Sequence, residues 1–216
     1  MSFWLTIFQA QTMLKILQSQ FQFIDRTLFL ISVFLFFIGL IASIPVVKNE
    51  IRFFLYYPLW VWKRLKMFLQ AKPPFFKLFL LIFFFNSISL VANIISGIGV
   101  ILPYVFSFLI GLNVGIIGYF EGGRKALLGM FLAPHVIFEL PAAWISTTLG
   151  MQIGQEILKG SGLVVPILKH SMLLYVHILI PLLLIAGIIE AALINIMMKP
   201  LQHAASFAEE PLDTQK

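Results

Sequence analysis

Three ionisable side chains stand inside otherwise apolar stretches of this sequence and could do chemistry there. His135 and Glu139 lie four residues apart in the segment LAPHVIFELP, so a helix would carry both on one face. Glu190 stands in the apolar run GIIEA near the end of the chain. A carboxylate at the centre of a membrane-spanning helix costs about 2.5–3.5 kcal/mol on insertion scales, and such residues usually mark functional sites. The alternative interpretation is a His–Glu pair that satisfies itself and only fixes a broken helix.

Two prolines bracket this segment. Pro134 directly precedes His135, and Pro141 follows Glu139 by two residues. Proline lacks a backbone N–H and clashes with the carbonyl group four residues earlier, so both positions are predicted to break a helix at membrane depth. Many transporters build their substrate sites from helices broken beside ionisable groups.

Asparagine side chains add further polar candidates. Asn86 and Asn93 share one face of a predicted helix with two serines, and Asn113 lies in the next apolar segment. Such side chains can form hydrogen bonds across helix contacts in a bundle or between protomers. A polar pathway through the bundle is the other interpretation of the same pattern.

Enzyme chemistry is not predicted. A helical His-x-x-x-Glu has the spacing to share one metal ion, but catalytic zinc generally needs three protein ligands and an open position. The chain has no His-Glu-x-x-His motif and no recognisable Ser–His–Asp arrangement, and it contains no cysteine for thiolate ligands or thiol catalysis. We therefore expect no catalytic residue, no metal and no cofactor.

The composition indicates the environment in which these side chains lie. Apolar residues make up 60% of the 216 residues and charged residues 11%, and the mean hydropathy is +0.99. A soluble domain carries about 25% charged residues, so this chain has too few to cover a water-facing surface. Ten-residue alternating segments typical of a membrane barrel are not found. The predicted fold class is an all-α, polytopic transmembrane helical bundle in the cell membrane.

About five membrane spans are predicted in a single bundle over residues 27–200, since roughly 20 apolar residues cross the hydrocarbon core. The predicted spans lie near 27–47, 78–96, 100–120, 126–150 and 171–197. Residues 1–26 carry a heptad-like apolar stripe and are predicted to form an amphipathic helix on the membrane or the bundle, with a coiled-coil dimer as the alternative. The polar tail 201–216 is predicted to be flexible.

Glycines at helical spacing predict close helix contacts in the third and fourth spans. Small residues let helix backbones approach closely in lipid, where hydrophobic association is absent. The predicted packing residues are Gly111, Gly115, Gly118, Gly150 and Gly154. Such contacts form within one bundle or between protomers, and we expect a homo-oligomer.

The segment 48–77 is basic and aromatic. Its basic residues are Lys48, Arg52, Lys63, Arg64, Lys66, Lys72 and Lys77, seven of the fifteen in the chain. Its prolines argue against one continuous helix, so an interfacial loop is predicted. The residues expected to contact anionic lipid headgroups are Trp60, Trp62, Lys63, Arg64 and Lys66. The positive-inside rule puts this loop and the C-terminus in the cytoplasm, and lipid rather than nucleic acid explains the net charge of +6.

The segment 134–141 also carries a family resemblance. Pro-His-x-x-x-Glu-Leu-Pro, followed by Gly-x-x-x-Gly at 150–154, resembles the stage II sporulation protein M family of integral membrane proteins. Further agreeing features are Asn86 and Asn93 before Gly97 and Gly99, Asn113 with Gly115, and Ile189-Glu190-Ala191.

The resemblance covers roughly residues 78–197 and departs from the family at two positions. Val114 follows Asn113 and Val136 follows His135, where the family commonly has glycine. The resemblance implies a shared membrane core. The namesake of the family acts as a membrane anchor that helps to recruit a cell-wall-degrading complex during engulfment in sporulation.

Three functions remain open from the sequence. The leading one is a non-enzymatic scaffold that recruits other membrane proteins or remodels the bilayer, because no soluble domain is predicted beside the glycine faces and the basic loop. The second is a transporter, channel or lipid-translocating protein with a polar site at His135, Glu139 and Glu190. The third is an intramembrane metallohydrolase that uses the same residues as ligands or base.

Overall fold

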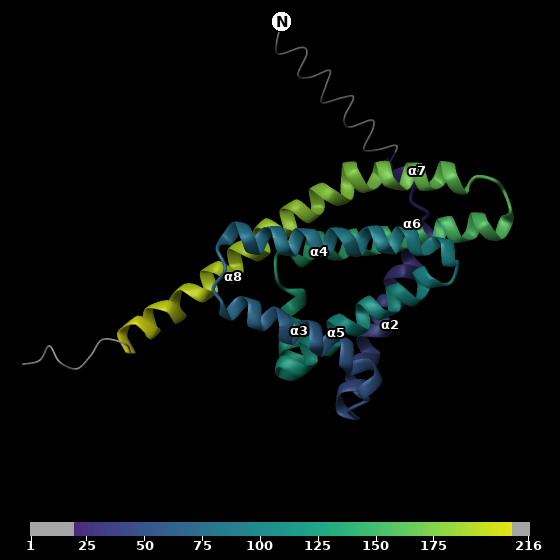
Figure 1. The fold of residues 1–216 in the computed structure, drawn as a ribbon. Coiled ribbons are helices and arrows are strands. Elements are labelled where there is room, and N and C mark those ends of the chain that lie inside the picture. Colours follow the sequence, from purple (N-terminus) through teal and green to yellow (C-terminus); the bar gives the residue numbers. More distant parts are fainter. Residues whose placement is uncertain (1–19, 209–216) are drawn as a thin grey trace, which may run out of the picture.

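The computed structural model describes residues 20–208, with side chains through Met197, and the regular structure in this range is helical. The elements in chain order (Figure 1) are α2 (Arg26–Lys48), α3 (Arg52–Gln70), α4 (Phe75–Ile95), the 3-10 helix η1 (Ser96–Gly99), α5 (Leu102–Phe131), α6 (Val136–Lys159), α7 (Val164–Leu174), the π-helix η2 (Tyr175–Leu179) and α8 (Ile180–Ala208). The predicted all-α polytopic bundle is confirmed. Most of the helix predicted over residues 1–26 lies outside the described residues.

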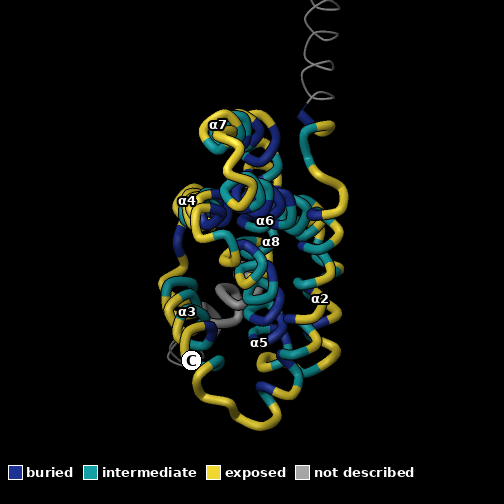
Figure 2. Tube along the Cα trace, turned by 90° about the vertical axis from the view of Figure 1, so that its right-hand side faces the viewer, coloured by how far each residue is buried: buried dark blue, intermediate teal, exposed yellow. Residues whose placement is uncertain are grey.

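Four helical segments in the described part are long and apolar enough to cross a membrane. They are Arg26–Lys48, Phe75–Gly99, Leu102–Phe131 and Val164–Met197. The 24-residue helix α6 is about 36 Å long at 1.5 Å per residue, but it carries more polar side chains. Figure 2 shows α6 in the middle of the bundle, and its buried residues run from Ala142 to Gly154. Because α6 is surrounded by other helices, its sequence does not need the apolar character of a lipid-facing helix.

The boundaries predicted for the fourth span, 126–150, are wrong. Helix α5 continues to Phe131 across a kink at Gly122 and Gly123, and α6 begins only at Val136. Gly123 has a φ of +64°, a conformation that glycine adopts without steric cost. The kink brings Leu127 against Gly118 of the same helix. Hydropathy could not locate the break between α5 and α6, because the sequence is apolar on both sides of residues 132–135.

Pro134 lies in the break before α6, whereas Pro141 lies inside α6 and does not interrupt it. The predicted helix break at Pro141 is therefore wrong. The carbonyl group with which Pro141 conflicts belongs to Ile137 in the first turn of α6, so little helix precedes the proline.

The predicted interfacial loop at 48–77 is largely a helix, α3, and Pro58 lies within it. The carbonyl group four residues before Pro58 also belongs to the first turn, at Phe54, so the helix continues past the proline. The boundary of the predicted C-terminal tail is likewise shifted, because α8 continues past residue 200 to Ala208. Residues 209–216 lie outside the described part.

Helices α2 and α5 approach so closely that their backbones are in contact. A Cβ atom added at Gly111 would meet the carbonyl oxygen of Phe36, and one added at Gly39 would meet that of Phe108. Between these helices the Ser32 hydroxyl lies 3.0 Å from that of Ser107. It also lies 2.6 Å from the Thr147 hydroxyl, which joins α6 to the same polar contact.

Helix α6 packs against α4 and η1 in the same manner. A Cβ atom at Gly150 would meet the carbonyl oxygen of Asn93, and one at Gly154 would lie 3.0 Å from Val100. The Asn93 amide donates a hydrogen bond to Ser146 at 3.0 Å. The predicted packing glycines, including Gly115 beside Ser43 of α2, thus face contacts within one chain. They give no support to a homo-oligomer, which stays a prediction.

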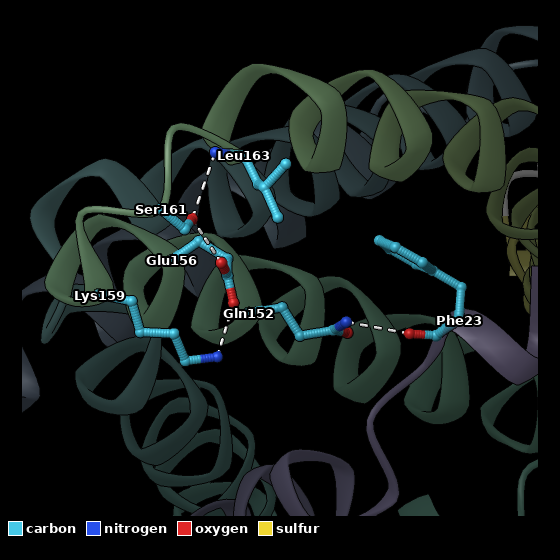
Figure 3. A network of polar contacts seen from close by, with 6 residues as sticks. All are labelled: Phe23, Gln152, Glu156, Lys159, Ser161 and Leu163. Carbon is cyan, nitrogen blue, oxygen red and sulfur yellow. Dashed lines mark hydrogen bonds and ion pairs between the residues drawn. The ribbon is translucent and has the colours of Figure 1, made fainter.

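Polar contacts fix the far end of α6 (Figure 3). Gln152 donates a hydrogen bond to the carbonyl oxygen of Phe23 at 2.9 Å, which ties the segment before α2 to α6. Glu156 pairs with Lys159 at 2.7 Å. It also accepts a hydrogen bond from Ser161 at 2.6 Å, in the turn between α6 and α7. Glu156 is thus a partly buried carboxylate with partners of its own.

Candidate functional site

His135, Glu139 and Glu190 come together where the start of α6 meets α8. His135 is the N-cap residue of α6, and Glu139 lies in the first turn of that helix. One potential ligand atom from each residue lies within 4.8 Å of the others, and all three residues are partly buried. Helical spacing predicted the proximity of His135 and Glu139, whereas only the packing of α8 brings Glu190 to them.

A cavity of about 580 Å³ adjoins the two carboxylates, between α3, α4, α6 and α8. Small-molecule sites have volumes of roughly 300–1,000 Å³. The polar wall includes Glu139, Glu190, Arg64 and Asn86, and the Asn86 side chain contacts the Glu139 carboxyl group. The remaining wall is mostly apolar and aromatic, from Tyr57, Trp60, Val61, Leu65, Phe68, Leu81, Ile82, Phe85 and Ser89.

The carboxylates lack a paired positive charge in the described part of the chain. The two salt bridges found there join Lys66 to Glu121 and Lys159 to Glu156. Arg64 is exposed at the cavity wall, with its guanidinium carbon 5.5 Å from the centre of the Trp60 ring.

His135 adds a buried polar atom that lacks a hydrogen-bond partner. Its Nδ1 atom is buried and has no hydrogen-bond partner in the described structure. A buried polar atom without a partner costs about 1–3 kcal/mol. The cluster therefore combines two negative groups with a free imidazole nitrogen, an arrangement that a bound cation would stabilise.

The other predicted polar residues divide between the site and the packing. Asn86 lines the cavity, whereas Asn93 is buried and bonded to Ser146 between α4 and α6. Asn113 is partly buried on α5 and does not line the cavity. A continuous polar path through all three asparagines is therefore not formed. His177, near the outer end of the predicted span 171–197, is a further candidate for a buried polar residue, but it is exposed on η2.

The contribution of α3 to the cavity was missed from the sequence. The signal was present, because its lining residues follow helical steps of three and one: Tyr57, Trp60, Val61, Arg64, Leu65 and Phe68. Among the residues predicted to contact lipid headgroups, Trp60 and Arg64 line this cavity and Lys63 is exposed.

The remaining two headgroup candidates are engaged by α5. The Trp62 indole donates a hydrogen bond to Glu121 at 2.5 Å, and Lys66 forms an ion pair with the same carboxylate at 2.9 Å. Their polar atoms therefore fix α3 on α5.

The family model of Stage II sporulation protein M matches residues 28–193 of the chain. The chain belongs to this family. The match confirms the membership indicated by the sequence and extends it from residue 78 back to α2, so it includes all four helices around the cavity. No curated protein and no solved structure matches the chain. This member of the stage II sporulation protein M family is an integral membrane protein, as its apolar helices require.

Proposed function

We propose that this membrane protein is a transporter that binds a small cation in the cavity between α3, α4, α6 and α8. The observation that carries the proposal is the pair Glu139 and Glu190, which lie together on the cavity wall without an ion-pair partner in the described chain. Ionisable residues within membrane bundles commonly mark ion and substrate pathways.

The electrostatic energy favours a positive ligand. Two ionised carboxylates within 4.8 Å of each other would repel by at least about 3.5 kcal/mol at an effective dielectric constant of about 20. A cation between the carboxylates replaces this repulsion with two attractions. The aromatic ring of Tyr57 adds a surface that attracts positive charge.

Flux measurements in proteoliposomes test the proposal. Wild-type protein is expected to move at least one member of a panel of metal and organic cations, and Glu139→Gln is expected to abolish that movement at matched, verified insertion. Glu156→Gln is the control, because it removes a carboxylate from the opposite end of the same helix, outside the cluster. Absence of flux across the panel, or equal flux through Glu139→Gln, would contradict transport.

A scaffold is the second candidate, and the exposed face of α3 favours it. Phe53, Tyr56 and Lys63 are exposed on this helix and do not line the cavity. Such a surface suits anionic headgroups or another membrane protein. A photo-crosslinker at Phe53 should capture one defined protein in native membranes if the chain is a scaffold. Lipid adducts alone, together with cation flux, would favour the transporter.

A further inference from the structure

We infer that His135, Glu139 and Glu190 bind a divalent first-row transition metal ion, with one side of the ion open to the cavity. The inference deepens the proposed function and rests on it, since it names the class of cation for the same cavity. The sequence predicts no metal, because spacing places only His135 and Glu139 on one helix face. Helix α8 supplies the third ligand.

The geometry of the three residues is close to that of a metal site. Their ligand atoms lie within 4.8 Å of one another. Metal–ligand bonds of about 2.0–2.2 Å keep the ligands of one ion within roughly 4.4 Å of each other. Rotation of the flexible glutamate side chains covers the remaining few tenths of an ångström.

The backbone that carries these ligands is well supported. His135 and Glu139 are fixed at the start of α6. On α8, Ala191 is fully buried beside Glu190, and Gly187 lies close to Phe79 of α4.

The ligand types select the class of metal. An imidazole nitrogen favours zinc, iron, nickel or copper ions over magnesium and calcium, which prefer all-oxygen sites. The chain has no cysteine, so it offers no thiolate for soft monovalent ions. A neutral histidine and two carboxylates together carry a charge of −2, which a divalent ion balances.

The histidine distinguishes a transition metal from other cations. Coordination through Nδ1 would satisfy an imidazole nitrogen that is buried without a hydrogen-bond partner. Sodium could balance the carboxylates but prefers oxygen ligands, so it would leave this nitrogen without a partner. Asn86, in contact with Glu139, would orient that ligand from outside the coordination sphere.

Three protein ligands leave at least one coordination position for water or another small molecule. That position faces the cavity, because Glu139 and Glu190 both line it. An open position of this kind would allow the ion to enter and leave, as transport requires.

Calorimetric titration of purified, chelator-treated protein in detergent tests the site. Wild type is expected to bind one Zn²⁺ or Ni²⁺ per chain and to bind Mg²⁺ at least tenfold more weakly. His135→Ala, Glu139→Gln and Glu190→Gln should each weaken Zn²⁺ binding by at least tenfold. The matched controls Glu156→Gln and His177→Ala change groups outside the cluster and should leave the affinity unchanged.

A ligand replacement separates coordination from folding. Glu190→His restores a ligand at this position and should bind Zn²⁺ more tightly than Glu190→Gln, with both variants checked for monodisperse elution. Equal Zn²⁺ affinity in the three cluster variants and wild type would overturn the inference, as would an equal loss in the two controls.

The metal site and the transporter can fail separately. Stoichiometric Zn²⁺ or Ni²⁺ binding without flux of any cation would support the metal site and contradict transport. Flux of another cation that Glu139→Gln abolishes, without binding of either metal, would support transport and overturn the metal site.

Discussion

At the residue scale, the arrangement of Glu139 and Glu190 is expected to cost stability. Two partly buried carboxylates lie together without a salt bridge in the described chain. Replacing a buried charge with a neutral group of similar shape is often neutral or stabilising. Sites built for binding commonly carry such a cost.

We therefore expect Glu190→Gln to stabilise the metal-free protein. At alkaline pH, where both carboxyl groups are ionised, the substitution removes one repelling charge and keeps the side-chain shape, so the free energy of unfolding should rise by about 1–3 kcal/mol. Thermal unfolding in detergent with excess chelator measures the change. A lower unfolding temperature for the variant would indicate an attractive partner for Glu190 and contradict the expected repulsion.

The effects of Glu139→Gln and Glu190→Gln should not be additive. Once either charge is removed, the repulsion is gone, so the second substitution should gain less. We expect an interaction energy of about 0.5–3 kcal/mol in a double-mutant cycle on the metal-free protein. The pair Glu190→Gln and Glu156→Gln serves as the control and should be additive within about 0.5 kcal/mol. Additive effects at Glu139 and Glu190 would argue against direct interaction.

At the element scale, the contact between α2 and α5 depends on the absence of side chains. The Cβ of any residue other than glycine at 111 would collide with the backbone carbonyl of Phe36, which cannot rotate away. The helices would have to separate, and the polar contact among Ser32, Ser107 and Thr147 would be disturbed with them.

Gly111→Ala is therefore expected to destabilise the protein by about 1–3 kcal/mol, the usual cost of overpacking. Gly129→Ala is the matched control in the same helix, since an added Cβ there meets no atom within 4 Å. Alanine at 129 should raise stability by up to about 1 kcal/mol through its helix propensity. Thermal unfolding of both variants provides the measurement, and equal effects would show that α2 and α5 tolerate a wider spacing.

At the scale of the whole molecule, the membrane topology depends on whether α6 crosses the membrane. Lys72 precedes α4 and Ser161 follows α6, so three helices separate the two positions if α6 crosses the membrane. The positive charge around α3 predicts that Lys72 faces the cytoplasm. Ser161 then faces the opposite side.

Single-cysteine labelling should reveal this orientation, and the chain contains no native cysteine to interfere. An impermeant thiol reagent is expected to label Ser161→Cys in intact cells and Lys72→Cys only after permeabilisation. Labelling of both variants on the same side would mean that α6 does not cross the membrane. The reversed pattern would invert the topology.

Much of the fold could be predicted because the underlying signals are local. Apolar runs located α2 and α4 closely, and the family motif was readable around His135 and Glu139. The helix breaks predicted at Pro58 and Pro141 were wrong, because the effect of a proline depends on how much helix precedes it. The boundary between α5 and α6 was misplaced because hydropathy does not distinguish lipid-facing from helix-facing residues.

The sequence by itself determined a helical membrane protein, its family, and a His–Glu pair on one helix face, because composition and i to i+4 spacing are properties of the chain alone. Only the tertiary structure decided that Glu190 joins this pair and that Arg64 and Asn86 share its cavity. These residues lie on different helices, and their proximity depends on how α3, α4 and α8 pack around α6. No spacing within a single helix encodes that packing.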